Sequence, residues 1–164
     1  KIKVLLISEP LVSVLEIIPY LKSLLKHKDI EIAIKVRPMV KDSYYEDMKV
    51  AFPLSNNLKV FDKKIEDIAN EFDIFIGSNS TAVIEASLLG KISVLLNTIK
   101  FGDYFDIDTL MSDQLLLVRQ PDQLYKHIIN RVNNEHSLNT IEKIRKRFFG
   151  DNNDGSQWVI NQLH

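Results

Sequence analysis

The alternation of short apolar runs with helical stripes constrains the fold of this chain more than any other feature. Runs rich in Val, Ile and Leu occur at residues 1–8, 30–36 and 91–96. Such continuous runs are typical of strands that are buried on both faces of a parallel sheet. Between the first two runs, apolar residues over 11–27 recur every three or four positions, as on an amphipathic helix. This alternation favours a parallel sheet covered by helices on both faces.

The same pattern can be followed along the whole chain. It predicts strands at residues 1–8, 30–36, 58–61, 72–77, 91–96 and 114–118. It predicts helices at residues 11–27, 63–71, 81–89, 123–133 and 140–148. We therefore expect an α/β fold, a Rossmann-like doubly wound domain whose mostly parallel sheet has about six strands. A length of 164 residues suits one such domain, which we place at residues 1–164.

Composition narrows the possible functions. The chain has 21 Lys and Arg against 22 Asp and Glu, so its net charge of -1 gives no field that would attract nucleic acid. The absence of cysteine excludes disulfides and thiol catalysis and fits a reducing compartment. No apolar run approaches the roughly 20 residues that span a bilayer. We expect a cytoplasmic protein with no nucleic-acid partner. Because the chain begins at Lys1, directly before a strand, we also expect it to be part of a longer protein.

The turn after the fourth predicted strand combines several features of an anion site. Gly77 would let the backbone approach a ligand closely, and Ser78, Ser80 and Thr81 follow around the start of a helix. Ligands of parallel sheets bind beyond the carboxyl ends of the strands, and a helix N-terminus favours negative charge. A phosphate or pyrophosphate would suit this turn. In the alternative interpretation, Ser80 serves only as the N-cap of the helix.

Glu85 lies one helical turn beyond this turn. Its carboxylate could accept hydrogen bonds from the diol of a ribose, as acidic residues do in dinucleotide-binding folds. The alternative is an exposed carboxylate that is favoured by the positive end of the helix dipole.

Residues 72–98, FDIFIGSNSTAVIEASLLGKISVLLNT, resemble the nucleotide-sugar segment of GT-B glycosyltransferases. In that family a strand ends in a Gly/Ser turn, and Ser-Thr, a helix bearing Glu-Ala, a Gly and a further strand follow. Residues 148–156, FFGDNNDGS, resemble the segment before the last helix in members that build capsules and other bacterial surface polysaccharides. The 72–98 region is also similar to sugar-nucleotide 2-epimerases and to the GlcNAc transferase of peptidoglycan synthesis. The resemblance covers essentially the whole chain and implies the C-terminal half of a GT-B enzyme.

The resemblance also implies roles for individual residues. It assigns Ser78, Ser80 and Thr81, with Gly77, to the diphosphate, and Glu85 to the ribose. Lys35 lies near the end of the second predicted strand, and Arg37 directly follows that strand. Both are therefore candidates for binding the phosphate of the leaving group. Several relatives have His where this chain has Arg37, so a general acid is not expected there.

The function implied by the resemblance is the binding of a nucleotide-sugar or nucleotide-polyol donor within a glycosyltransferase of surface-polysaccharide synthesis. The acceptor and the catalytic base would belong to a missing N-terminal domain, so no catalytic residue is assigned and the chain alone should not turn over donor. No cofactor is expected. The alternatives are an epimerase-like enzyme domain and a non-catalytic binding or assembly module.

Two further groups of residues have the chemistry of possible sites. The four histidines have no metal-ligand spacing, and the aspartates at 103, 106, 108 and 113 lack the pattern of a calcium loop, so no metal is expected. The basic run Lys143, Arg145, Lys146 and Arg147 could contact the inner face of an anionic membrane. A solvated helix face is favoured, because four charges attract a membrane only weakly.

Overall fold

The computed structural model describes residues 1–35, 43–51, 59–61, 63–110, 112, 114–133 and 138–150. Its sheet has the order β3-β2-β1-β4-β5-β6, and every neighbouring pair of strands is parallel. Five strands have four to six residues: β1 (Ile2–Ile7), β2 (Ile30–Lys35), β4 (Ile74–Gly77), β5 (Ile92–Leu96) and β6 (Leu115–Val118). The edge strand β3 (Lys59–Phe61) has only three. The predicted α/β fold with a parallel sheet is confirmed.

Helices connect these strands. The α-helices are α1 (Val14–Leu25), α2 (Ser43–Ala51), α3 (Ile65–Ile68), α4 (Thr81–Leu88), α5 (Leu124–Val132) and α6 (Leu138–Phe149). Short 3-10 turns occupy η1 (Ala69–Glu71), η2 (Ile107–Thr109) and η3 (Pro121–Gln123). The helix predicted at 63–71 is therefore one α-helical turn followed by a 3-10 turn. In the described part of the chain, no helix combines the length and the apolar character needed to cross a membrane.

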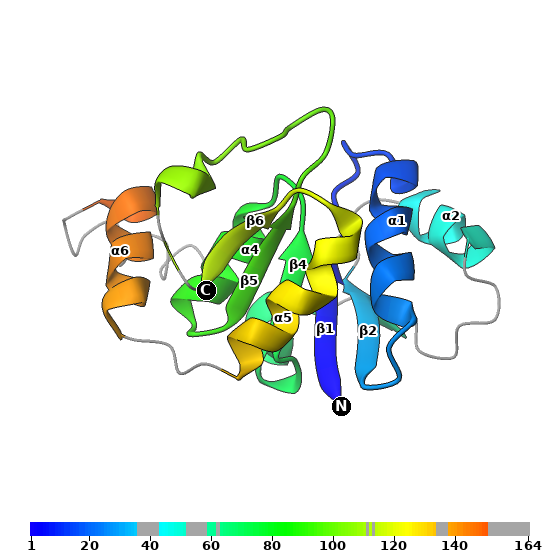
Figure 1. Cartoon of the computed structure of the whole chain (residues 1–164), viewed down its shortest axis with the longest axis horizontal. Helices are drawn as coiled ribbons and strands as arrows, with labels where there is room; N and C mark the ends of the chain where they lie inside the picture. Colours follow the sequence, from blue (N-terminus) through cyan, green and yellow to red (C-terminus); the bar gives the residue numbers. More distant parts are fainter. Residues whose placement is uncertain are drawn as a thin grey trace.

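The sheet is buried on both faces. Val4 and Leu6 of β1 belong to one core cluster, together with buried residues of α1 and α5. Leu5 and Ile7 belong to the other, with residues of α3, α4 and α6. Because successive side chains of a strand point to opposite faces, the two clusters lie on the two sides of the sheet. Figure 1 shows α1 and α5 in front of the strands and α4 behind them.

The strand order creates a switch point between β1 and β4. From β1 the chain builds outward to β2 and β3 on one side, and then returns to build β4, β5 and β6 on the other. In open α/β sheets of this kind, ligands bind in the crevice at the carboxyl ends of the strands where the order reverses. The segments that border this crevice are residues 8–13, after β1, and 78–80, which lead into α4.

The loop after β5 is tied to α1. The Tyr20 hydroxyl lies 2.9 Å from the carbonyl oxygen of Asn97 and 3.2 Å from that of Val118. The Glu16 carboxylate accepts a hydrogen bond from the backbone N–H of Ile99 at 2.5 Å. Lys100 donates to the carbonyl oxygen of Leu11 at 3.3 Å. These contacts hold the loop over the carboxyl edge of the sheet, where Figure 1 shows it passing above the strands.

Gly77, the last residue of β4, is required by packing. A Cβ atom at this position would lie 2.9 Å from Cγ2 of Val83 and 3.2 Å from the carbonyl oxygen of Ile7. Val83 is fully buried in the cluster beneath α4, so it has little room to move. The glycine thus allows α4 to pack closely against β4 and β1, which sets the position of the helix N-terminus.

We expect Gly77→Ala to destabilise the fold by roughly 1 to 3 kcal/mol, as overpacking of a core does. A urea denaturation curve measures this as a lower midpoint at an unchanged slope. Thr81→Ala, at an exposed position of the same turn, is the matched control and should change stability much less. A Gly77→Ala variant as stable as the wild-type chain would contradict the packing role.

Candidate functional site

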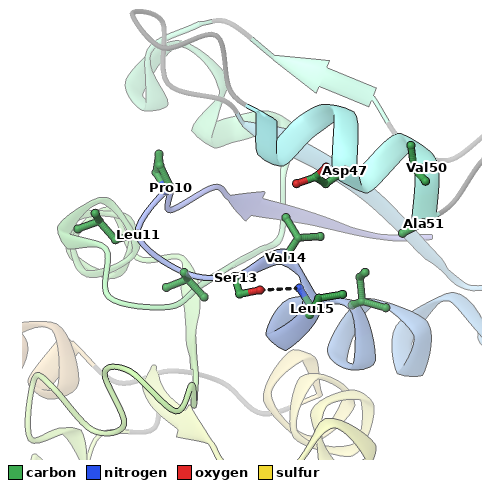
Figure 2. A pocket seen from close by; sticks show the side chains of 10 residues that line it. Pro10, Leu11, Ser13, Val14, Leu15, Asp47, Val50 and Ala51 are labelled. Carbon is green, nitrogen blue, oxygen red and sulfur yellow. Dashed lines mark hydrogen bonds between the residues drawn. The ribbon is translucent and has the colours of Figure 1, made fainter.

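The start of α4 lacks the side-chain cap that the sequence allows. Ser80 is the N-cap residue, with φ -128° and ψ 120°, but its hydroxyl makes no capping hydrogen bond. The start of α1 is different, because Ser13 accepts a hydrogen bond from the backbone N–H of Leu15 at 3.3 Å (Figure 2). The structure therefore gives no support to the interpretation that Ser80 only caps its helix.

The first backbone N–H groups of α4 are available to a ligand. The first bond of the helix runs from the N–H of Val83 to the carbonyl oxygen of Ser80, at 3.1 Å. The N–H groups of Thr81 and Ala82 have no hydrogen-bond partner within the described ranges. Unsatisfied N–H groups at the positive end of a helix form an anion site. They lie at the carboxyl end of β4, beside the switch point.

The three hydroxyl groups of the turn are not equally accessible. Ser78 and Ser80 are buried, at 2% and 6% exposure, and Thr81 is exposed. The Ser78 hydroxyl has no hydrogen-bond partner among the described residues. A phosphate at this turn would therefore meet the backbone N–H groups and the Thr81 hydroxyl first. The sequence-based assignment of Ser78 and Ser80 to direct phosphate contacts stays a prediction, and Gly77 has a packing role in any case.

Glu85 provides a half-buried carboxylate one turn into α4. Burial raises the pKa of the Glu85 carboxyl above its ordinary value, and the neighbouring Glu66 carboxylate of α3 raises this pKa further. Within the described part of the chain, no hydrogen bond or ion pair satisfies the Glu85 carboxylate. An unpaired, partly desolvated carboxylate would gain from hydrogen bonds donated by a ligand diol. The geometry is compatible with the ribose role that the resemblance implies.

Lys35 lies at the same edge of the sheet as α4. It ends β2, and its carbonyl oxygen accepts a hydrogen bond from the N–H of Ser8 at 3.0 Å. One strand, β1, separates β2 from β4, so the two backbones are about 10 Å apart. Strand alternation from Ala33 puts Lys35 on the face that carries α4. Arg37, the other predicted cation, lies outside the described residues.

A cavity of about 640 Å³ lies next to the switch point, between the start of α1 and α2 (Figure 2). Its lining is mostly apolar and includes Leu11, Leu15 and Val50. Among the described residues of this lining, the only ionisable side chain is that of Asp47, a carboxylate. Of the predicted site residues that the structure describes, none lines this cavity.

Sequence reasoning missed the polar residues that follow β1. Ser8 and Glu9 are buried, at 1% and 4% exposure, and they border the switch point beside the turn at 78–80. The Glu9 carboxylate accepts a hydrogen bond from the N–H of Leu11 at 3.3 Å. Only the strand order shows that β1 and β4 are neighbours, and the sequence does not give that order. The signal that the sequence offers is the polar pair Ser8 and Glu9 directly after the apolar run 4–7.

The aspartates of the loop after β5 form ion pairs that stabilise the loop. Asp103 and Asp108 pair with Arg119, and Asp106 pairs with Arg147 of α6 at 2.9 Å. Among the described residues, no group of three or more His, Cys, Asp or Glu could hold a metal ion. Asp113, also in the predicted loop, lies outside the described residues. The ion pairs give these aspartates a structural role.

Neither a protein-family model nor a curated protein matches the sequence. Solved structures do match the fold. The spinosyn rhamnosyltransferase SpnG shares 12% identity over 99% of this chain and 44% of its own, with a TM-score of 0.64. A Listeria monocytogenes protein described as a UDP-N-acetylglucosamine 2-epimerase shares 10% identity over 97% and 43%, with a TM-score of 0.60. The S. aureus MnaA–UDP structure shares 10% over 99% and 44%, with a TM-score of 0.59.

These similarities establish the fold. The chain has the fold of one part of glycosyltransferase and epimerase structures, a Rossmann-like domain of the GT-B type. It spans less than half the length of the chains that it matches. The predicted fold relationship is thus confirmed at this coarse level.

The raised pKa of Glu85 predicts a stability effect with a definite sign. In the folded chain this carboxyl holds its proton more tightly than in the unfolded chain. Its contribution to stability is therefore present below the unfolded pKa and lost as the pH rises through the folded value. We expect Glu85→Gln to raise the denaturation midpoint at pH 7, by an amount that shrinks toward zero at acid pH. Glu66→Gln should give a smaller gain, because Glu66 is the lesser cause.

Chemical denaturation between pH 4 and pH 8 measures both variants against the wild-type chain. A Glu85→Gln variant that is less stable than wild type at pH 7 would show that the carboxylate is a structural group.

Proposed function

We propose that this chain binds the nucleoside diphosphate of an activated sugar at the N-terminus of α4 and serves as the donor-binding domain of a glycosyltransferase. One observation carries the proposal: α4 starts at the switch point of the sheet, its Thr81 and Ala82 N–H groups have no partner among the described residues, and its N-cap hydroxyl makes no capping bond. A diphosphate would supply the negative charge and the acceptors that this turn lacks.

The remaining groups fit the rest of such a ligand. Glu85 lies one turn further along α4 and would accept hydrogen bonds from the ribose hydroxyls. Lys35 lies on the same edge and face of the sheet, where it would add positive charge near the phosphates. Structures with this fold have been solved with nucleotides: one of SpnG holds thymidine diphosphate, and that of MnaA holds UDP. These ligands support a nucleotide role for the shared fold.

The chemistry served by this site is displacement at the anomeric carbon of the sugar. As the bond to the sugar breaks, negative charge develops on the diphosphate. N–H groups already oriented toward the diphosphate stabilise that charge without reorganising. The acceptor and its base would come from another part of a longer protein, in keeping with the larger size of the matched structures.

The resemblance of residues 72–98 and 148–156 leads us to place this activity in bacterial surface-polysaccharide synthesis, inside the cell. The same proposal includes a peripheral contact of α6 with the membrane, but the structure weakens the case for this contact. Among its basic side chains, Arg145 pairs with Glu142 and Arg147 pairs with Asp106. These pairs reduce the charge available to attract anionic lipid.

An epimerase acting on a sugar nucleotide is the second candidate, favoured by the match to the Listeria protein. It would use the same diphosphate and ribose contacts and would need further acid and base groups. A turnover assay of a full-length protein would separate the two activities, because the epimerase needs no acceptor.

Nucleotide titration tests the proposed site. We expect UDP, CDP or GDP to bind the wild-type chain, and Glu85→Gln to weaken that binding by roughly 1 to 3 kcal/mol through the loss of charged hydrogen bonds. Isothermal calorimetry at pH 7 gives both affinities. Glu66→Gln is the matched control, because it removes a neighbouring carboxylate that has no assigned ligand contact. If none of the three nucleotides bound the folded chain at millimolar concentration, the proposed site would be wrong.

A further inference from the structure

A concave apolar surface lies between the start of α1 and α2. It is the cavity of about 640 Å³ that Figure 2 shows. Leu11, Leu15 and Val50 line this cavity and are 61%, 77% and 80% exposed. Large apolar side chains that gather around a hollow, instead of being scattered singly, mark an interaction site. The volume of the cavity lies within the range of pockets that hold small molecules.

Two helices hold the walls of this cavity. Met48 of α2 is fully buried in the core cluster that contains α1, so α2 is fixed beside α1. Asp47, Val50 and Ala51 have the spacing i, i+3 and i+4, which puts them on the face of α2 that lines the cavity. Ser13, the N-cap of α1, also lines it. Because Ser13 and Ala51 are small, their side chains leave the space between the helices open.

The described residues of the lining give the cavity a negative charge. Asp47 contributes an exposed carboxylate, which has no hydrogen bond or ion pair within the described ranges. The neighbouring Glu46 pairs with Lys49 at 3.2 Å. The Lys100 ammonium donates to the carbonyl oxygen of Leu11, and Lys100 is not part of the described lining. A ligand with a positive group would therefore complement Asp47, and a ligand with a negative group would be repelled.

We propose that this cavity binds the alkyl portion of a small amphiphile whose positively charged head group pairs with Asp47. The apolar walls formed by Leu11, Leu15 and Val50 would bury the chain, which is favourable because it removes apolar surface from water. The carboxylate at the side of the cavity would select the sign of the head group. This inference does not depend on the proposed nucleotide site, because no described residue assigned to that site lines the cavity.

Two amphiphiles of equal chain length and opposite charge test the role of Asp47. Octylammonium and octanoate are each titrated at pH 7 into wild type, Asp47→Asn and Glu46→Gln, with binding followed by calorimetry. We expect wild type to bind octylammonium about fivefold more tightly than octanoate, because one exposed ion pair is gained and one repulsion is avoided. Asp47→Asn should bind both with similar affinity. Glu46→Gln changes the adjacent carboxylate and should keep the preference of wild type.

Chain length and the cavity wall test the apolar part of the proposal. We expect wild type to bind octylammonium roughly tenfold more tightly than hexylammonium, because two further methylene groups are buried. Leu15→Gln makes the wall polar and should weaken octylammonium binding by about fivefold. Leu89→Gln is the matched control, because Leu89 is 54% exposed, follows α4 and is not part of the described lining. It should bind octylammonium as wild type does.

Several outcomes would overturn the inference. Wild type that binds octylammonium and octanoate equally would exclude the pairing with Asp47. Unchanged octylammonium affinity in Leu15→Gln, or no binding to wild type at millimolar concentration, would exclude the alkyl site. Self-association of wild type in sedimentation experiments that Leu15→Gln abolishes would show that the cavity is an interface between copies of the chain.

A UDP titration of the same variants separates this inference from the proposed function. We expect Asp47→Asn and Leu15→Gln to bind UDP as wild type does. Failure of wild type to bind UDP would remove the proposed nucleotide site and leave the alkyl site standing. Weaker UDP binding in both variants would show that the cavity belongs to the nucleotide site, which would contradict the inference.

Discussion

The close contact between Gly77 and its neighbours determines where this domain can bind an anion. With no Cβ at the end of β4, Val83 packs directly against the strand, and the Ile7 carbonyl of β1 lies within 3.2 Å of the position where a Cβ would be. The start of α4 is therefore held against β1 and β4, at the point where the strand order reverses. A larger residue at position 77 would move the helix away from the crevice. The packing of Val83 and β1 against Gly77 therefore sets the position of the proposed anion site.

Each feature of the proposed site lowers the stability of the folded chain when no ligand is bound. The first turn of α4 leaves two N–H groups unpartnered among the described residues, and the buried Ser78 hydroxyl is also unsatisfied there. The pKa of Glu85 is raised because burial and Glu66 oppose its charge. α1 shows that a serine hydroxyl of the same chain can cap a helix, because Ser13 accepts a hydrogen bond from the N–H of Leu15. Binding sites commonly reduce the stability of the folded chain, and a bound ligand then restores that stability.

The sequence predicted the elements well, because unbroken apolar runs and helical stripes follow directly from burial of a parallel sheet. The turn at 77–81 was found for the same reason, since it follows a clear strand and starts a clear helix. The sequence could not show that Ser78 and Ser80 point inward, because side-chain burial depends on how α4 packs on the sheet.

The central claim is that the N-terminus of α4 holds the phosphates, and NMR can test it at single residues. In a ¹⁵N-HSQC titration of the chain with UDP, we expect the amide signals of Thr81 and Ala82 to shift in a saturable way as their N–H groups gain acceptors. Leu15, whose N–H already donates to Ser13, should move little. Saturable shifts confined to the apolar cavity at the start of α1, with Thr81 and Ala82 unchanged, would contradict the account.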